Sequence, residues 1–137
     1  MEYVDSQDID RKELYDIFDD EEITLYMYKI LKALDYAHSQ GIFHRDMKPG
    51  NVMINPETRD LKIIDWGLAG FFMMDKEYTL HTGTRIYICP EMLTGMTNYD
   101  YAIDMFSLSV IFAGMIFNIE HFFESRINDY DMMKKHT

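Results

Sequence analysis

The stretch HRDMKPGN, residues 44–51, decides how this sequence is interpreted, and the triplet DWG follows it at residues 65–67. The stretch fits the pattern H-R-D-x-x-x-x-N, which places a carboxylate and an amide in one loop. The four fixed residues arise by chance in a chain this short on the order of once in a thousand, and the D-x-G lowers that chance further. The alternative is a polar loop that only joins a helix to a hairpin.

Four residues in and after this stretch have side chains suited to phosphoryl transfer. That reaction needs a carboxylate to orient the attacking hydroxyl and accept its proton, and oxygen ligands for Mg²⁺. Asp46 is the predicted base, and Lys48, two residues further on, is placed to hold a phosphate oxygen. Asn51 and Asp65 are predicted Mg²⁺ ligands, because a hairpin between them would return them to the same edge.

That hairpin is predicted from two short β-prone runs, residues 51–54 and 61–64, separated by the polar turn 55–60. Upstream, Asp19 and Glu22 have the spacing of a capping box, which predicts a helix that ends at Gly41. Helical spacing predicts one buried face for it, made of Ile23, Met27, Ile30, Leu31, Leu34 and His38.

Three further segments have distinct patterns. A capping box at residues 10–13 predicts a short helix through Phe18. Residues 71–97 show no sustained period, which indicates a functional loop. Residues 101–117 are apolar nearly all round, as in a central helix covered on every side. The apolar run at residues 105–117 is shorter than the roughly 20 residues that span a bilayer.

Composition limits the classes of partner. The chain has 137 residues, 24 acidic against 13 basic, for a net charge of −11, and 47% of its residues are hydrophobic. It is long enough for one domain or part of one, with a packed core. The acidic charge argues against nucleic acid and anionic membrane partners, which need clustered Lys and Arg. Cys89 is alone, and residues 1–10 lack a secretory signal, so we expect a reducing intracellular compartment.

Together these motifs resemble the eukaryotic protein kinases, and within them the catalytic alpha subunits of casein kinase II. Trp66 supports the closer match, because most kinases have Phe at this position. The segments that carry it are Glu2–Val4, Tyr26–Tyr28, Leu31–Tyr36, Asn51–Ile54, Ile64–Ala69 and Tyr99–Tyr101.

The resemblance implies an α+β fold, mainly α-helical: an incomplete C-terminal (large) lobe with a catalytic β-hairpin. Residues 1–137 are then a partial kinase domain that runs from the hinge to the helix after the central helix, without the small lobe. No G-x-G-x-x-G occurs in the sequence. Beside Asp65, the implied ATP-binding residues are Glu2 and Val4 of the hinge, and Met53 and Ile64, although apolar residues at such positions are more often plain core.

Further roles are implied by matching residues one at a time. Asp104 resembles the buried aspartate that holds the backbone of the H-R-D loop, with a helix-surface carboxylate as the alternative. Thr84 is similar to the residue that hydrogen-bonds the catalytic carboxylate and favours Ser/Thr substrates; a solvent-facing threonine is the alternative. His44 is expected to be structural. His81 and Ile88 replace basic residues that attract acidic substrates in this family, which places acidic specificity in doubt.

The predicted function is therefore that of a Ser/Thr protein kinase that transfers the γ-phosphate of ATP, with Mg²⁺, to protein substrates, and that is weak or inactive as this polypeptide alone. A casein kinase II regulatory (beta) subunit is a further implied partner, and the implied location is cytoplasmic, nuclear or both. One alternative is a catalytically silent interaction module. Another is an acidic adaptor for basic proteins, which rests on the net charge alone.

Overall fold

The computed structural model describes residues 11–80, 83–119 and 123. Helices dominate this part of the chain, and its strands form two small antiparallel sheets, β1–β4 and β2–β3. This agrees with the predicted α+β class. The elements are α1 (Arg11–Ile17), α2 (Asp20–Ser39), β1 (Ile42–Phe43), η1 (Pro49–Asn51), β2 (Val52–Asn55), β3 (Asp60–Ile63), η2 (Trp66–Leu68), β4 (Gly70–Phe71), η3 (Arg85–Tyr87), α3 (Pro90–Leu93) and α4 (Ala102–Phe117), where η denotes a 3₁₀ turn.

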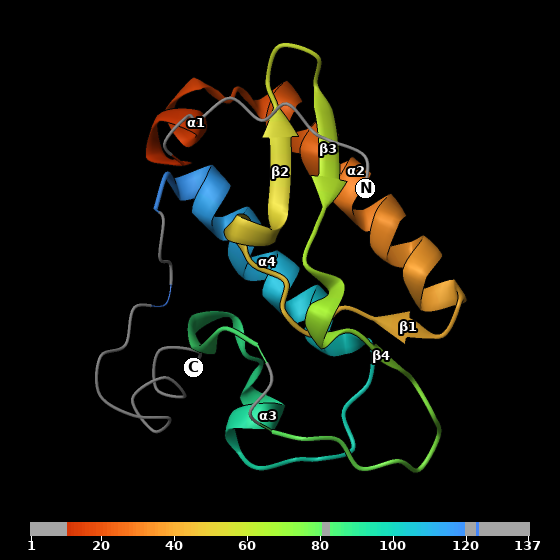
Figure 1. Ribbon diagram of the computed structural model, residues 1–137. Coiled ribbons are helices and arrows are strands. Elements are labelled where there is room, and N and C mark those ends of the chain that lie inside the picture. The colour runs from red at the N-terminus through yellow and green to blue at the C-terminus, as the bar shows by residue number, and fades with distance from the viewer. Residues whose placement is uncertain (1–10, 81–82, 120–122, 124–137) are drawn as a thin grey trace.

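Helices α2 and α4 pack against each other, and the hairpin β2–β3 lies across them (Figure 1). The main core fills the space between these elements. A second apolar cluster lies beside it and joins the loop after β4 to the start of α4; its buried members are Phe43, Tyr78, Cys89, Met92, Tyr99 and Ile103.

The capping box predicted for α2 is confirmed. The Oδ1 atom of Asp19 accepts a hydrogen bond from the backbone N–H of Glu22 at 2.8 Å, and the Glu22 carboxylate accepts one from the Asp19 N–H at 3.4 Å. The helix ends at Ser39, and Gly41 follows with φ +77°, a left-handed conformation that glycine adopts without strain. The capping box at residues 10–13 involves Asp10, which lies outside the described residues.

The predicted buried face of α2 is confirmed at Ile23, Ile30 and Leu34, whereas Met27 and His38 are half-buried and Leu31 is exposed. Leu31 is 41% exposed, because it lies about 100° round the helix from Ile30 and falls outside the stripe that faces the core. Tyr26, absent from the prediction, is fully buried instead. The buried stripe is Ile23, Tyr26, Ile30, Leu34 and Ala37.

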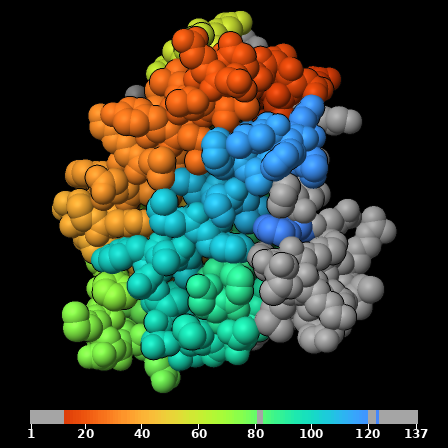
Figure 2. Space-filling view, turned by 180° about the vertical axis from the view of Figure 1, so that it is seen from behind, coloured from red at the N-terminus to blue at the C-terminus, as the bar shows by residue number. Residues whose placement is uncertain are grey.

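Helix α4 is central but is not covered on every side, contrary to the prediction. Its cyan and blue atoms reach the surface between α2 and α3 (Figure 2). Met105, Ile116 and Phe117 are exposed, while Leu108, Ile111 and Met115 are buried. An apolar sequence therefore does not by itself show how many neighbours a helix has. In the part of the chain that the structure describes, no helix is long and apolar enough to cross a membrane.

The predicted hairpin is confirmed, with strands shifted by about one residue. The register pairs Val52 with Ile63 and Asn55 with Asp60. The Asn55 side chain holds the turn, because its Oδ1 accepts hydrogen bonds from the N–H groups of Glu57 and Thr58 at 3.0 and 3.1 Å.

The segment predicted as a functional loop, residues 71–97, contains two short structured pieces, η3 and α3. Tyr78 anchors its first half through a backbone hydrogen bond to Thr97 of 2.8 Å. Cys89 is buried in the second apolar cluster, and burial raises the pKa of its thiol to about 11. The thiol therefore stays protonated at neutral pH and packs as a small apolar side chain.

Candidate active site

The carboxylate of Asp46 is the centre of the candidate site. Its Oδ2 accepts hydrogen bonds from Lys48 Nζ at 2.7 Å and from Asn51 Nδ2 at 3.1 Å. Its Oδ1 accepts two more from Thr84, at 2.8 Å from the backbone N–H and 2.9 Å from the hydroxyl. The structure thus brings together Asp46, Lys48 and Asn51, the three predicted catalytic residues. The contact of Thr84 with this carboxylate, which the resemblance implied, is confirmed, and the alternative of a solvent-facing threonine is wrong.

These contacts favour the ionised form of Asp46. Burial alone would raise its pKa, but hydrogen bonds from Lys48 and Thr84, together with the charge of Lys48, outweigh burial and lower the pKa below its usual value. The group is therefore a carboxylate at neutral pH. The stability that the Asp46 carboxylate contributes is present at neutral pH and is lost as the pH falls through the lowered pKa.

The backbone of the H-R-D loop is held by Asp104 of α4. Its two carboxylate oxygens accept hydrogen bonds from the N–H groups of His44 and Arg45, at 2.7 and 2.8 Å. Asp104 is only 1% exposed, so the contact implied by the resemblance is confirmed and the alternative of a helix-surface carboxylate is wrong. His38 Nε2 lies 2.9 Å from the same carboxylate. Sequence reasoning placed His38 only on a helix face and missed this contact.

His44 is structural, as expected. It is fully buried, its Nε2 lies 3.1 Å from the carbonyl oxygen of Ile64, and its ring packs against Trp66. The next residue, Arg45, has φ +68°, and its side-chain Nε donates to the carbonyl of Leu68 at 2.6 Å. These two side chains therefore connect the loop at Asp46 to the segment that carries Asp65.

The two predicted Mg²⁺ ligands lie at one edge of the hairpin. The N–H of Ile64 donates to the carbonyl of Asn51 at 2.9 Å, which brings the residue before Asp65 alongside Asn51. The Asn51 Nδ2 also donates to the carbonyl of Asp46 at 2.8 Å, which fixes the orientation of its amide. Asp65 is exposed, with φ +58°.

This donor set fits Mg²⁺ better than a transition metal. An amide oxygen and a carboxylate are hard oxygen donors, and Mg²⁺ commonly takes one or two protein ligands while waters and phosphates complete its shell. Among residues 11–80, 83–119 and 123 there is no cluster of three or more His, Cys, Asp or Glu that could hold a metal. Asn51 and Asp65 could supply such ligands, and Mg²⁺ binding by them remains a prediction.

Of the four hinge or apolar residues implied for ATP binding, Met53 and Ile64 lie in the part of the chain that the structure describes. Met53 pairs with Lys62 in the hairpin, and Ile64 lies two residues beyond Lys62, so Met53 and Ile64 share one face. Both are half-buried. Glu2 and Val4 lie outside the described residues. Nucleotide contact by any of these four remains a prediction.

Gly83 is a functional position that sequence reasoning missed. A Cβ atom built on it would lie 2.6 Å from the carbonyl oxygen of Arg45, closer than real Cβ contacts, and its φ of +96° favours glycine. Only glycine therefore lets the segment approach the H-R-D loop closely enough for Thr84 to reach Asp46. The signal in the sequence was weak, because a single glycine before a threonine is common.

Gly83→Ala is expected to destabilise the chain by about 1–3 kcal/mol, since it combines a left-handed backbone with a steric clash. Urea denaturation would measure this. Gly95→Ala is the matched control: Gly95 has φ +89°, but a Cβ there meets nothing within 4 Å. A Gly83→Ala variant no less stable than Gly95→Ala would contradict the close-approach argument.

The arrangement of a hydrogen-bonded carboxylate, an adjacent lysine and two oxygen donors at a hairpin edge defines a site suited to phosphoryl transfer. The sequence matches the family model described as Protein kinase domain over residues 1–137. The chain therefore belongs to the protein kinase domain family. Kinase function in general follows, and members of this family generally use ATP and Mg²⁺ and act on protein substrates.

Proposed function

We propose that this chain is the large-lobe part of a Ser/Thr protein kinase similar to the catalytic alpha subunits of casein kinase II. The observation that carries the proposal is the pair of hydrogen bonds from Thr84 to one oxygen of Asp46. A hydroxyl in this position supports Ser/Thr acceptors by the family resemblance, and Trp66 supports the closer match. An associated regulatory beta subunit and a cytoplasmic or nuclear location belong to the same proposal.

Each residue has a role in the proposed reaction. Asp46, ionised and held in place, accepts the proton of the substrate hydroxyl as that hydroxyl attacks the γ-phosphate. Lys48, which contacts both Asp46 and Thr84, also presents its ammonium group to the transferring phosphate. Asn51 and Asp65 would hold Mg²⁺, which would supply positive charge to offset the phosphate oxygens. Thr84 keeps the carboxylate oriented.

The alternative is a catalytically silent interaction module. No G-x-G-x-x-G pattern occurs in the 137 residues, and in this alternative the retained lobe binds a partner protein and transfers no phosphate. The two functions differ in whether the polypeptide binds Mg²⁺ and ATP together and whether completing the domain produces turnover. Binding can be measured first, because it needs no substrate.

ATP is expected to bind these 137 residues weakly and only with Mg²⁺, with a Kd of about 1 mM, or about −4 kcal/mol. Asp65 is exposed and Met53 and Ile64 are only half-buried, so this open site leaves most of the ligand in water. Asp65→Asn should weaken this binding further by removing charge from the metal site, and raised Mg²⁺ should partly restore it. Isothermal titration calorimetry with and without Mg²⁺ would measure both effects.

Asp60→Asn is the matched control for this measurement. Asp60 is an exposed carboxylate on the same hairpin, at the end far from Asn51, so its loss should leave the Mg²⁺ dependence unchanged. ATP binding that does not respond to Mg²⁺, or that Asp65→Asn leaves intact, would contradict the proposed metal site. Micromolar affinity would contradict the expectation of an open site.

A further inference from the structure

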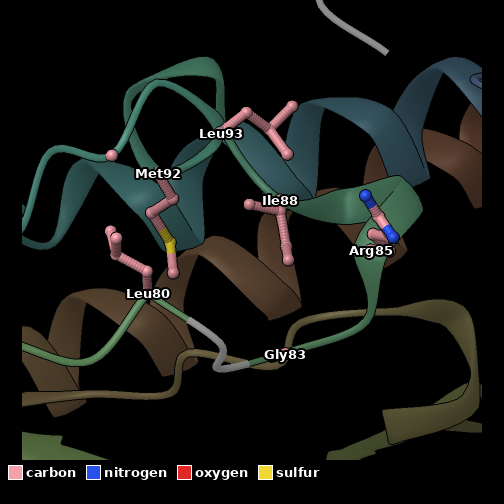
Figure 3. A pocket seen from close by; sticks show the side chains of 7 residues that line it. Leu80, Gly83, Arg85, Ile88, Met92 and Leu93 are labelled. Carbon is pink, nitrogen blue, oxygen red and sulfur yellow. The ribbon is translucent and has the colours of Figure 1, made fainter. Parts of the chain in front are cut away.

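Cavities of similar size lie at two places in the fold. One, of about 350 Å³ between η3 and α3, has Gly83 in its wall beside Thr84 and so belongs to the candidate active site (Figure 3). The other, of about 370 Å³, lies between the C-terminal half of α2 and the strand β3. None of the residues that line this second cavity hydrogen-bonds to Asp46. It is therefore a separate feature of the surface.

One stripe of α2 forms the helical wall of this second cavity. Its members are three or four positions apart, which places them on one face of the helix: Lys29, Ala33, Tyr36, Ala37 and Gln40. Ala33 and Ala37 have short side chains, which leave room beside the helix. Ile42 and Trp66 add further apolar surface to the lining.

The opposite wall is the outer edge of β3. Leu61, Lys62 and Ile63 all line the cavity, although successive side chains of a strand point to opposite faces, so the cavity meets the strand from its edge. This edge lies toward α2 (Figure 1). In the part of the chain that the structure describes, β3 pairs with β2 alone. The cavity therefore opens onto an unpaired strand edge.

The backbone groups at this edge point into the cavity. The N–H of Ile64 donates to the carbonyl of Asn51 across the hairpin, and hydrogen bonding alternates along an antiparallel strand, so Leu61 and Ile63 turn their N–H groups away from β2. The carbonyl of Ile63 accepts a hydrogen bond from Trp66 Nε1 at 3.1 Å. Among the described residues no group accepts a hydrogen bond from the N–H of Leu61 or Ile63. Such donors are what an edge strand offers to an added strand.

The charge beside the cavity is positive, although the chain as a whole has a net charge of −11. Lys29 and Lys62 are the charged residues of the described lining. Lys29 also donates a hydrogen bond to the carbonyl of Arg59, which keeps its ammonium group beside the hairpin turn. Charges attract one another over about 10 Å at ordinary ionic strength, so these lysines favour a ligand with carboxylates near the cavity.

We propose that an extended acidic segment of a partner protein adds as a strand to the outer edge of β3 and places one apolar side chain in this cavity. The N–H groups of Leu61 and Ile63 bind its main chain, the alanines of α2 contact its apolar side chain, and the two lysines attract its carboxylates. The inference goes beyond the proposed function, because it uses none of the residues assigned to phosphoryl transfer and holds whether or not the chain transfers phosphate.

The first test compares labelled peptides on the unmodified 137-residue chain. Fluorescence anisotropy measures binding of the fluorescein-labelled peptide Thr-Glu-Thr-Leu-Thr-Glu-Thr. Replacing its Leu by Ser should weaken binding about 10-fold, because the apolar contact is lost. Replacing both Glu by Lys should weaken it about 5-fold at low ionic strength. Equal binding of the Leu and Ser peptides, tighter binding of the Lys peptide, or no binding at millimolar concentration would overturn the proposal.

Methylation of the peptide backbone tests strand addition itself. Alternate N–H groups of an added strand point toward β3, so an N-methyl group on the Leu and one on the Thr after it block different edges. One of these two peptides should bind about 10-fold more weakly than the parent, and the other should change by less than about 3-fold. Equal effects of the two methyl groups would show that the peptide does not pair with the strand.

Variants of the chain locate the site. Ala33→Phe fills the cavity and should weaken binding of the parent peptide at least about 10-fold, whereas Leu31→Phe, on α2 outside the lining, should not. Lys62→Glu should weaken binding more than Lys76→Glu, which reverses the same charge at an exposed residue outside the lining. Unchanged binding by a folded Ala33→Phe variant, checked by circular dichroism, would overturn the assignment to this cavity. The peptide comparisons need no variant, so misfolding cannot hide the main result.

Two further measurements distinguish a partner from other occupants. Peptide binding that appears only after residues 1–10 are deleted would assign the edge of β3 to that segment of the chain itself. Self-association of the chain in sedimentation that Ala33→Phe abolishes would assign the edge to a second copy. Either result would overturn the proposal of a partner protein, which requires a monomeric, full-length chain that binds the parent peptide.

Discussion

Asp46→Asn is expected to lower kcat by about 10²- to 10⁴-fold, the usual loss when a general base is removed. The measurement of kcat uses a fusion of this chain to the small lobe and last helices of a casein kinase II alpha subunit. The amide cannot accept the proton of the substrate hydroxyl. Its oxygen can still accept the two hydrogen bonds from Thr84, while its NH2 group cannot accept those from Lys48 and Asn51. Asp104 still holds the loop backbone, so the loop should keep its shape. KM for the peptide should therefore change much less than kcat.

Asp60→Asn is again the control, because it makes the same chemical change on the hairpin away from Asp46. A folded Asp46→Asn fusion that keeps more than about a third of the parent kcat would show that Asp46 is not the base. A correctly folded parent fusion with no turnover would instead favour the silent interaction module. Steady-state kinetics on a Ser peptide, with folding checked by thermal unfolding, distinguishes these outcomes.

Local patterns in the sequence predicted those parts of the structure that depend on neighbouring residues. The capping box at Asp19 and the pairing of β2 with β3 involve contacts within a few residues or across one short turn. The shared edge of Asn51 and Asp65 follows from that same hairpin. Short-range geometry therefore sufficed to place the predicted Mg²⁺ ligands on one edge.

Contacts between distant segments were predicted only through the family resemblance, or not at all. Thr84 and Asp46 are 38 residues apart, and His38 and Asp104 are 66 apart. No periodicity or spacing relates such pairs, because the packing of whole elements brings them together. The family pattern indicated the Thr84 contact. The contact of His38 with Asp104 and the close approach of Gly83 to Arg45 are visible only in the structure.

Burial was the least predictable property. Leu31 is as apolar as Leu34, yet it is 41% exposed because it lies outside the stripe of α2 that faces the core. The sequence of α4 likewise predicted complete coverage, although Phe117 is exposed. Hydrophobicity shows that burying a side chain is favourable in free energy. Only the arrangement of neighbouring elements shows whether that side chain is buried.

Asp104→Ala is expected to destabilise the chain by about 2–6 kcal/mol, because it leaves the buried N–H of His44 and the partly buried N–H of Arg45 without their acceptor, at about 1–3 kcal/mol each. Asp104→Asn keeps one acceptor oxygen and should lose about half as much. Urea denaturation followed by circular dichroism measures both. Asp35→Ala, at an exposed position of α2, is the control and should change stability by no more than about 0.5 kcal/mol. A loss below about 1 kcal/mol for Asp104→Ala would mean that other contacts hold the H-R-D loop in place.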